Sequence, residues 1–475
     1  MVNGFIFTCI RPAVFGSPPP GDHKDRHYRP TFPPPRRLFT LTVAIFLLLP
    51  ATLWAAPLGQ RSVLDNGLVL LVAERPEVPM VVTVVLVKAG SAQDEEGKEG
   101  LANLTALLLT RGTKYYDALA LAEELDFLGA SLSADVDYDF TTLTLTTLRK
   151  NLRAATTLLT EVLIAPTFLT QELDKKRKEV FGYLKTQEED PGWLAQKTFL
   201  ETLYPHHPYG RVIEGEEKSL AAITQADVVS FHRTYYRPNN VIVACAGSIS
   251  QEEATALFEG QFKDWQLGEI PHRPWPEPAL PQNPVVVTRD KEVSQANVVL
   301  GHQGIARANP DYYAVQAMNY LLGGGGFESR LMKRIREELG LVYHVGSSFS
   351  ARKNPGPFTI VLQTKNAAAK QAVEESLRVV RRFIDQGVTE QDLARAKAFF
   401  INSFPLRLVS NSQVAGLLPL LEFYGLGLDY PDRYADLINQ VTLDKVRQVA
   451  KSYLRPEHLL EVVVADLSQA GFASP

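Results

Sequence analysis

The chain has 475 residues, of which 45% are hydrophobic and 21% are charged, and its formal net charge is −4 at pH 7. This is the composition of a globular protein long enough for two or more domains. A moderately acidic chain is a poor candidate for binding nucleic acid or an anionic membrane surface. We therefore expect no nucleic-acid partner.

The first 55 residues are predicted to be a leader that contains a signal peptide. Residues 1–35 are rich in proline and show no helical or strand period, whereas Arg36 and Arg37 precede an apolar run over 38–49. A basic flank, a short apolar run and small residues after it are typical of a secretory signal peptide. We expect cleavage after Ala55 and an exported, periplasmic product. The alternative is an uncleaved membrane anchor. We expect contact with a membrane only in that case.

The rest of the chain divides at a segment rich in proline. Residues 265–284 contain six prolines and are predicted to form a stiff, extended linker. On either side lie stretches of about 200 residues with the same internal order, which predicts domains over 56–264 and 285–475. The repeat is visible where Ala-Glu-Glu-Leu at 122–125 aligns with Arg-Glu-Glu-Leu at 336–339.

Each half begins with strand-like runs and continues with a helix, a glycine break, a second helix, alternating strands and a long amphipathic helix. The opening runs are 68–72 and 81–87 in the first half, and 285–287 and 296–301 in the second. Residues 142–146 alternate with period two, as a half-buried strand should, and 358–364 is their counterpart. Helical spacing of apolar residues follows at 151–163 and at 367–384. We predict a duplicated α+β unit, each domain packing helices on one face of an antiparallel sheet.

The helix predicted over 99–113 contains no histidine or cysteine. Asn103, Ala106 and Leu107 carry an amide, a methyl and an isobutyl group, none of which grips a divalent cation. The histidines outside the leader do not replace such ligands, because none forms an i, i+3 or i, i+4 pair on a plausible helix. They are His206, His207, His232, His272, His302, His344 and His458.

Two further features have ordinary structural interpretations. Gly323–Gly326 lacks the Lys-Ser/Thr that phosphate binding would need, so we expect a flexible or tightly turned connection between two helices. Cys245 stands alone once the leader is removed, which excludes an internal disulfide and favours a buried, inert thiol.

In this order and spacing, several short motifs resemble the M16 peptidase family, the group of insulinase and the mitochondrial processing peptidase. The resemblance covers nearly all of the chain after the leader and is closest to the short bacterial subunits of that family. The motifs are Leu64-Asp65-Asn66-Gly67-Leu68, His207-Pro208-Tyr209-Gly210, Tyr235-Tyr236-Arg237-Pro238-Asn239-Asn240, Ser329-Arg330-Leu331 and Gly340-Leu341-Val342-Tyr343.

The resemblance implies a zinc site whose residues are missing here. In active members two histidines and a glutamate on one helix hold zinc and activate water. Asn103 and Leu107 stand at the histidine positions, Ala106 stands at the general base, and the third ligand falls near Tyr183. Glu179 lies one helical turn before Tyr183, but one carboxylate cannot hold zinc without the imidazoles. We therefore interpret 100–110 as a core helix and expect no metal or cofactor in this chain.

The resemblance also implies a pair of substrate-binding residues, and these are present. Arg336 and Tyr343 stand where active members have an arginine and a tyrosine that reach across an enclosed chamber to the substrate. A guanidinium and a phenol can hydrogen-bond peptide carbonyls and stabilise an oxyanion. The aligned residues of the first repeat are Ala122 and Gly129, so the pair is not a by-product of duplication.

These expectations combine into one leading hypothesis about function. The chain is expected to be the non-catalytic subunit of a heterodimeric zinc peptidase, forming half of a clamshell that admits unfolded peptides. A homologous catalytic subunit with an intact His-x-x-Glu-His helix would hold the zinc. The alternatives are a binding scaffold with no role in proteolysis, and an independently active zinc metalloendopeptidase, which needs a metal site that the sequence does not show.

Overall fold

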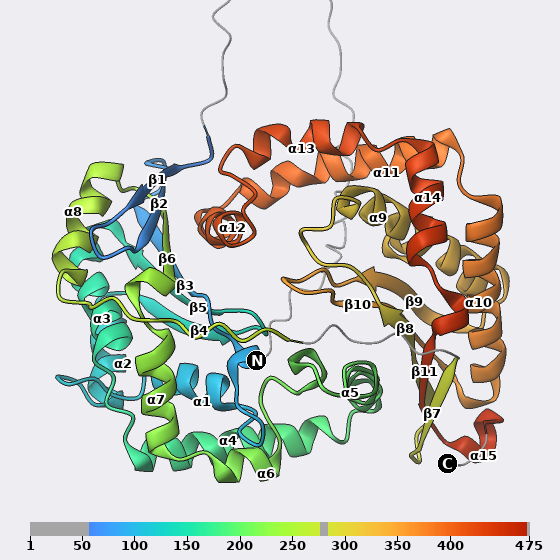
Figure 1. Ribbon diagram of the computed structural model, residues 1–475, viewed down its shortest axis with the longest axis horizontal. Helices are drawn as coiled ribbons and strands as arrows, with labels where there is room; N and C mark the ends of the chain where they lie inside the picture. Colours follow the sequence, from blue (N-terminus) through green and yellow to red (C-terminus); the bar gives the residue numbers. More distant parts are fainter. Residues whose placement is uncertain (1–56, 276–283, 473–475) are drawn as a thin grey trace, which may run out of the picture. The chain divides into compact units, whose positions relative to one another are not determined.

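The computed structural model of the chain describes residues 57–275 and 284–472. The predicted signal peptide and the cleavage after Ala55 lie outside the described residues. Within the described ranges, every helix is too short or too polar to span a bilayer. The two halves form two α+β domains, as predicted (Figure 1).

The first domain contains a six-stranded sheet in the order β1-β2-β6-β3-β5-β4. Its strands are β1 (Gln60–Val63), β2 (Val69–Glu74), β3 (Met80–Val87), β4 (Ser131–Val136), β5 (Thr141–Leu148) and β6 (Val241–Gly247). Its α-helices are α1 (Leu101–Leu108), α2 (Ala118–Phe127), α3 (Leu152–Ile164), α4 (Thr170–Gln187), α5 (Pro191–Leu203), α6 (Glu217–Ala222), α7 (Gln225–Tyr235) and α8 (Gln251–Phe262). Short turns of helix are η1 (Ser91–Gln93), η2 (Arg149–Asn151), η3 (Pro208–Gly210) and η4 (Pro238–Asn240).

The second domain contains a five-stranded sheet in the order β7-β11-β8-β10-β9. Its strands are β7 (Val285–Asp290), β8 (Gln295–Gln303), β9 (Val342–Phe349), β10 (Pro357–Lys365) and β11 (Leu460–Ala465). Its α-helices are α9 (Tyr312–Asn319), α10 (Ala369–Gln386), α11 (Glu390–Ser403), α12 (Asn411–Phe423), α13 (Tyr430–Asn439), α14 (Leu443–Tyr453) and α15 (Leu467–Ala470). Two π-helical turns, η5 (Tyr320–Gly324) and η7 (Met332–Glu338), complete it together with the 3₁₀ turns η6 (Gly326–Glu328), η8 (Asn366–Ala368), η9 (Phe404–Leu408) and η10 (Pro456–His458).

The two sheets have the same strand order once β1 is set aside, because β2-β6-β3-β5-β4 corresponds to β7-β11-β8-β10-β9. This supports the internal repeat read from the sequence. Neighbouring strands run antiparallel except for one parallel pair in each sheet, β2–β6 and β7–β11. The last strand of each domain lies between the first two core strands, which are antiparallel to one another. It must therefore run parallel to one of them.

Each sheet is covered on its second face by a helix from the other domain. Along β3, Val81 and Val85 face the core of the first domain, whereas Val82 and Leu86 face the opposite way and pack with α12 residues such as Leu418. In return, α5 packs on β8 and β11 of the second sheet through Phe199. This exchange was not predicted, since helices were expected on one face only. Because β3 and β6 are buried on both faces, they read as nearly continuous apolar runs.

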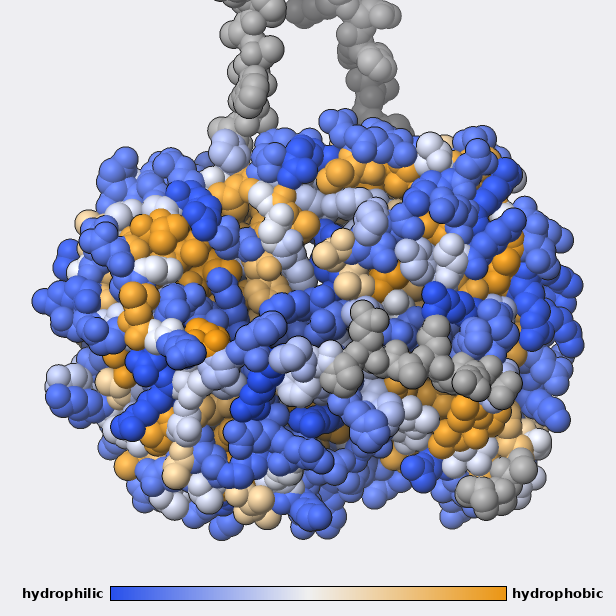
Figure 2. Space-filling model, in the orientation of Figure 1, coloured by the Kyte–Doolittle hydropathy of each residue, from blue (hydrophilic) through white to orange (hydrophobic). Residues whose placement is uncertain are grey.

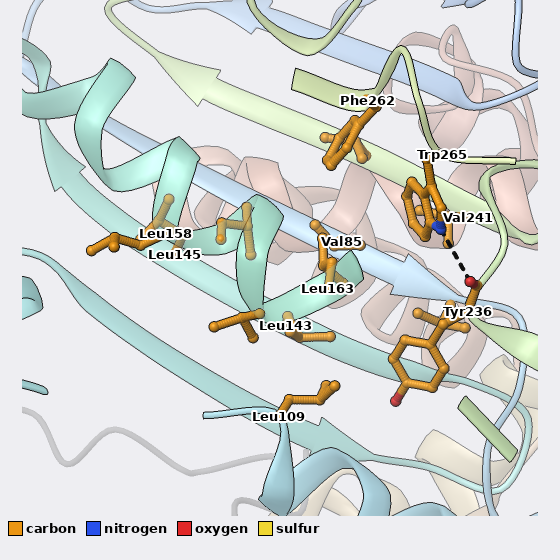
Figure 3. Packing of buried hydrophobic residues seen from close by; sticks show 14 of the residues in the cluster. Val85, Leu109, Leu143, Leu145, Leu158, Leu163, Tyr236, Val241, Phe262 and Trp265 are labelled. Atoms are coloured by element: carbon orange, nitrogen blue, oxygen red, sulfur yellow. Dashed lines mark hydrogen bonds between the residues drawn. The ribbon is translucent and has the colours of Figure 1, made fainter. Parts of the chain in front are cut away.

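The first domain's core extends into the start of the proline-rich segment. Trp265 is only 5% exposed and packs against Phe262, and its indole Nε1–H donates to the carbonyl oxygen of Tyr236 at 3.2 Å (Figure 3). In the same view, Val85 and Leu143 of the sheet face Leu163 of α3. The side chain of Trp265 is thus part of this domain's core.

Candidate functional site

The start of helix α1 is fixed by a buried carboxylate. Asp94, which is 1% exposed, accepts backbone N–H bonds from Gly100 and Ala102, each at 2.8 Å. Burial raises the pKa of Asp94 to about 8, although the two N–H donors and the nearby Arg211 act in the opposite direction. Gly100 has φ +96°, and a Cβ there would lie 2.5 Å from the carbonyl oxygen of Glu214. These contacts determine where the helix begins.

The three positions predicted to lack zinc ligands lie together on α1, as the sequence pattern indicated. Ala106 is 1% exposed, and Asn103 and Leu107 are half-buried. Leu104 and Leu108 on the same helix are completely buried in the first domain's core. The helix is therefore part of the core along most of its surface.

The fourth position, Tyr183, lies on α4, which packs against α1. Its half-buried ring contacts the same core as Leu107. Burial and the neighbouring Glu214 both raise the pKa of the Tyr183 phenol, and burial also raises the pKa of Glu214. Glu179 is exposed and is ion-paired to Lys176 on the same helix. Tyr183 is thus part of the packing around α1, and Glu179 is engaged elsewhere.

These side chains do not supply what zinc requires, which is a set of imidazoles, thiolates or carboxylates converging on one point. Within residues 57–275 and 284–472, no group of three or more His, Cys, Asp or Glu side chains is placed to hold a metal ion. We therefore assign no metal ligands in the described residues.

Arg336 and Tyr343 do lie together, and a third residue joins them. The guanidinium carbon of Arg336 is 4.9 Å from the ring centroid of Tyr343 and 4.7 Å from that of Phe327. Tyr343 is 76% exposed and Phe327 is 57% exposed. We call these three residues the Arg336 cluster. Stacking on rings occupies the faces of a guanidinium and leaves the N–H donors at its edge available for hydrogen bonds.

Phe327 was not predicted from the sequence, although it directly follows the glycine run. The backbone there is tightly packed, since a Cβ on Gly323 would lie 2.4 Å from Ser347 Oγ on β9. Gly326 has φ +57°, a conformation that favours glycine. The run spans the end of η5 and the start of η6, where Phe327 lies beside Arg336. An aromatic residue after four glycines was therefore the available signal.

A polar network between the two domains was also missed. The phenol of Tyr209 donates to the buried carboxylate of Asp139, with oxygen–oxygen distances of 2.8 and 2.9 Å. From the second domain, the Lys353 N–H donates to Asp139 at 3.1 Å and the Asn354 N–H donates to the Tyr209 oxygen at 3.2 Å. The guanidinium carbon of Arg352 lies 5.1 Å from the ring centroid of Tyr209. The His-Pro-Tyr-Gly motif therefore holds the β9–β10 loop of the other domain.

Burial raises the pKa of Asp139, and the bond from Tyr209 opposes this shift. Burial also raises the pKa of Tyr209, so its phenol stays protonated and keeps donating. The network joins residues far apart in the sequence, and its contacts account for these side chains without any catalytic role.

Comparison with known proteins assigns both domains to one family. Residues 69–217 match the family described as insulinase (peptidase family M16), and residues 222–400 match the domain described as the peptidase M16 inactive domain.

Individual relatives agree with these matches. A chain from Helicobacter pylori called non-peptidase homolog YmxG is 26% identical over 430 residues, covering 90% of this chain and 98% of its own length. An uncharacterized zinc protease from Rickettsia bellii is 24% identical over 403 residues, covering 85% and 90%.

A solved structure is also similar. The crystal structure of the peptidase M16 inactive domain from Pseudomonas fluorescens superimposes with a TM-score of 0.81 at 30% identity, covering 86% of this chain and 97% of that one. With the missing ligands on α1, these findings support a non-catalytic, M16-like protein. The chain belongs to the M16 peptidase family.

Proposed function

We propose that this chain is the non-catalytic subunit of a heterodimeric zinc peptidase. Its partner would be a homologous M16 subunit that carries an intact zinc helix and contributes the metal and the general base. The observation that carries this proposal is a contrast within one chain. Asn103, Ala106 and Leu107 on α1 offer no metal ligand, whereas the half-buried Arg336 lies against the ring of Tyr343, which is 76% exposed.

The chemistry of the Arg336 cluster suits an extended peptide. The edge of the Arg336 guanidinium and the phenol of Tyr343 can donate to peptide carbonyl oxygens, and they can stabilise the oxyanion that forms when a carbonyl is attacked. Tyr343 lies on β9, the edge strand of its sheet. An edge strand offers backbone groups to an added peptide strand, although the Ser347 carbonyl oxygen of β9 already accepts from the Asn319 amide at 3.0 Å. This mode of recognition depends little on side-chain identity.

The first domain also has a free sheet edge. Strand β4 ends the sheet beside α1, with Leu132, Ala134 and Val136 facing the core and the intervening residues Ser131, Ser133 and Asp135 exposed. An exposed edge strand is a template for strand addition, and on β4 only the charge of Asp135 opposes it. We therefore infer unfolded peptides as the substrate class. The leader suggests that this protein is exported to the periplasm. Its partner would then be exported too.

The proposal is tested by measuring peptide cleavage with the partner alone, this chain alone and their mixture. We expect activity only, or mainly, in the mixture. Arg336→Ala or Tyr343→Phe should leave assembly intact and lower the rate of the mixture by about 100-fold, the effect of losing an oxyanion donor. Arg381→Ala and Tyr115→Phe, which change exposed residues elsewhere, serve as matched controls.

Two results would contradict the proposal in different ways. Equal partner rates with and without this chain would remove any role in proteolysis, and normal rates with both cluster variants would favour a structural scaffold. Peptidase activity of this chain alone, abolished by a chelator, would favour an independent zinc enzyme.

A further inference from the structure

A cavity in the second domain has a positively charged rim that no part of the proposed function uses. Its volume is about 340 Å³, and it lies between the η6–η7 segment and helices α10 and α11. Leu321, Val379 and Phe383 supply apolar lining. Arg336 and Phe327 do not line it, so the cavity is separate from the Arg336 cluster.

The charges around this cavity are unbalanced. Five lining residues are cations and three are carboxylates, although the chain as a whole is acidic. The cations are Arg330, Lys333, Arg334, Arg382 and Arg395, and the carboxylates are Glu328, Glu338 and Asp392. The lining cations thus outnumber the lining carboxylates by two, and the buried Glu375, which pairs with Arg334 from outside the lining, reduces the excess to one.

Three of the cations are already held in position. Asp392 pairs with Arg330 at 2.9 Å and with Arg395 at 2.5 Å. Arg334 pairs with Glu338 at 2.8 Å and with the buried Glu375 at 3.3 Å. Guanidinium groups fixed by such pairs lose little entropy when they bind a ligand.

The other two cations have no such partner. Within the residues that the structure describes, neither Lys333 nor Arg382 lies within ion-pair distance of a carboxylate. Asp392 stays ionised, because bonds from Thr389 and Arg395 outweigh its burial and hold its pKa below the usual value. Asp392 therefore keeps its negative charge and its ion pairs with Arg330 and Arg395.

We propose that this cavity binds a phosphoryl group, with Lys333 and Arg382 as its principal ligands. A phosphate monoester carries close to two negative charges at neutral pH and can pair with both cations that have no carboxylate partner, whereas a single carboxylate would pair with one of them. Lysine and arginine are the side chains that bind phosphate oxygens. The apolar lining gives room for an organic body, so the phosphoryl group comes either from free phosphate or from a small phosphorylated molecule. The proposal does not depend on the proposed function.

Isothermal titration of the purified full chain with phenyl phosphate, inorganic phosphate and benzoate tests it. We expect phenyl phosphate to bind with one-to-one stoichiometry, and benzoate, which has the same ring with one negative charge, to bind at least about tenfold more weakly. Inorganic phosphate equal to phenyl phosphate would identify free phosphate as the source, and weaker binding would identify an organic phosphate.

The double variant K333Q/R382Q keeps the apolar stems and should weaken phenyl phosphate binding about tenfold or more. The control K370Q/R381Q removes two exposed cations of α10 outside the cavity and should change affinity by less than about twofold. If the double variant does not fold, K333Q and R382Q must each weaken binding singly. Absence of saturable binding, equal binding of benzoate, or equal loss in the control would overturn the proposal.

Discussion

Helix α1 in the first domain and the Arg336 cluster in the second differ most clearly in how far water reaches them. Leu104 and Leu108 are completely buried, whereas Tyr343 and Phe327 are 76% and 57% exposed. Burial of apolar surface accounts for the residues of α1. It does not account for two large rings held in water around a guanidinium. Hydrophilic residues cover most of the face seen in Figure 2, and apolar ones form separate patches.

The difference gives a rule for separating structural from functional residues within one repeated fold. Changes in α1 should act on the free energy of unfolding and leave binding to a partner or peptide alone. Changes in the Arg336 cluster should do the reverse. A variant that crosses this separation would contradict the rule.

The largest effect is expected for Leu104→Ala. Removing a fully buried leucine side chain should lower the free energy of unfolding by about 2–5 kcal/mol, because the transfer energy is lost and a cavity remains. Asn103→Ala, at a half-buried position on the same helix, should cost less than about 0.5 kcal/mol. Urea unfolding of both variants measures this. A large loss of stability in Asn103→Ala would mean that this residue, at the position of a zinc-binding histidine, contributes to the stability of the fold.

The buried carboxylate at the start of α1 should make stability depend on pH. Because the folded pKa of Asp94 is raised from 3.8 to about 8, the folded state holds the proton more tightly than the unfolded state does. The resulting stability is fully present below pH 3.8 and is lost as the pH rises through 8.

Asp94→Asn cannot titrate, so the wild type should lose stability relative to this variant between pH 5 and pH 8. The loss should be at most about 1.4 kcal/mol per pH unit. Unfolding by denaturant at several pH values measures the difference. A difference that does not vary with pH would show that Asp94 is ionised in the folded protein.

Changes in the polar network between the domains should affect the free energy of unfolding, as changes in α1 do, and should not affect peptide cleavage. Tyr209→Phe removes the donor to Asp139 and the acceptor for the Asn354 N–H, which should cost about 1–3 kcal/mol in thermal or denaturant unfolding. Tyr115→Phe is the matched control, since that phenol is on a ring that is 68% exposed. If Tyr209→Phe unfolds normally but alters peptide cleavage, this network has a role in function and not in stability.

The smallest effect is expected for Phe327→Leu. A cation–π contact at an exposed site contributes about 0.5–1 kcal/mol, so the mixture of both subunits should cleave peptide about two- to fivefold more slowly. The free energy of unfolding should not change. Phe127→Leu makes the same change at a ring that is 83% exposed on α2, and it should alter neither quantity. If Phe327→Leu lowers the free energy of unfolding, Phe327 has a structural role, as the residues of α1 do.

Much of the fold could be predicted because its signals are local. The period-two run that became β5 and the helical spacing of α3 are visible within single windows, and the repeat doubled each signal. The exchange of α5 and α12 could not be predicted. An amphipathic helix shows that it will bury one face, but its sequence does not say which of two similar sheets will cover that face.

The candidate site divides in the same way. The places of Arg336 and Tyr343 followed from the resemblance to a family, and the structure puts their side chains in contact. Their role in binding substrate stays a prediction. The Tyr209–Asp139 network depends on a contact between residues 70 positions apart, and Phe327 meets Arg336 only through the path of the backbone between them. No local pattern reports such pairs.

The central claim, that α1 holds no catalytic metal, is tested most directly by measuring zinc in the purified full chain. The chain is saturated with zinc, dialysed against buffer without metal, and analysed by plasma mass spectrometry. The account predicts that no stoichiometric zinc remains. One zinc ion retained per chain, and lost when α1 or α4 is altered at Asn103 or Tyr183, would contradict it.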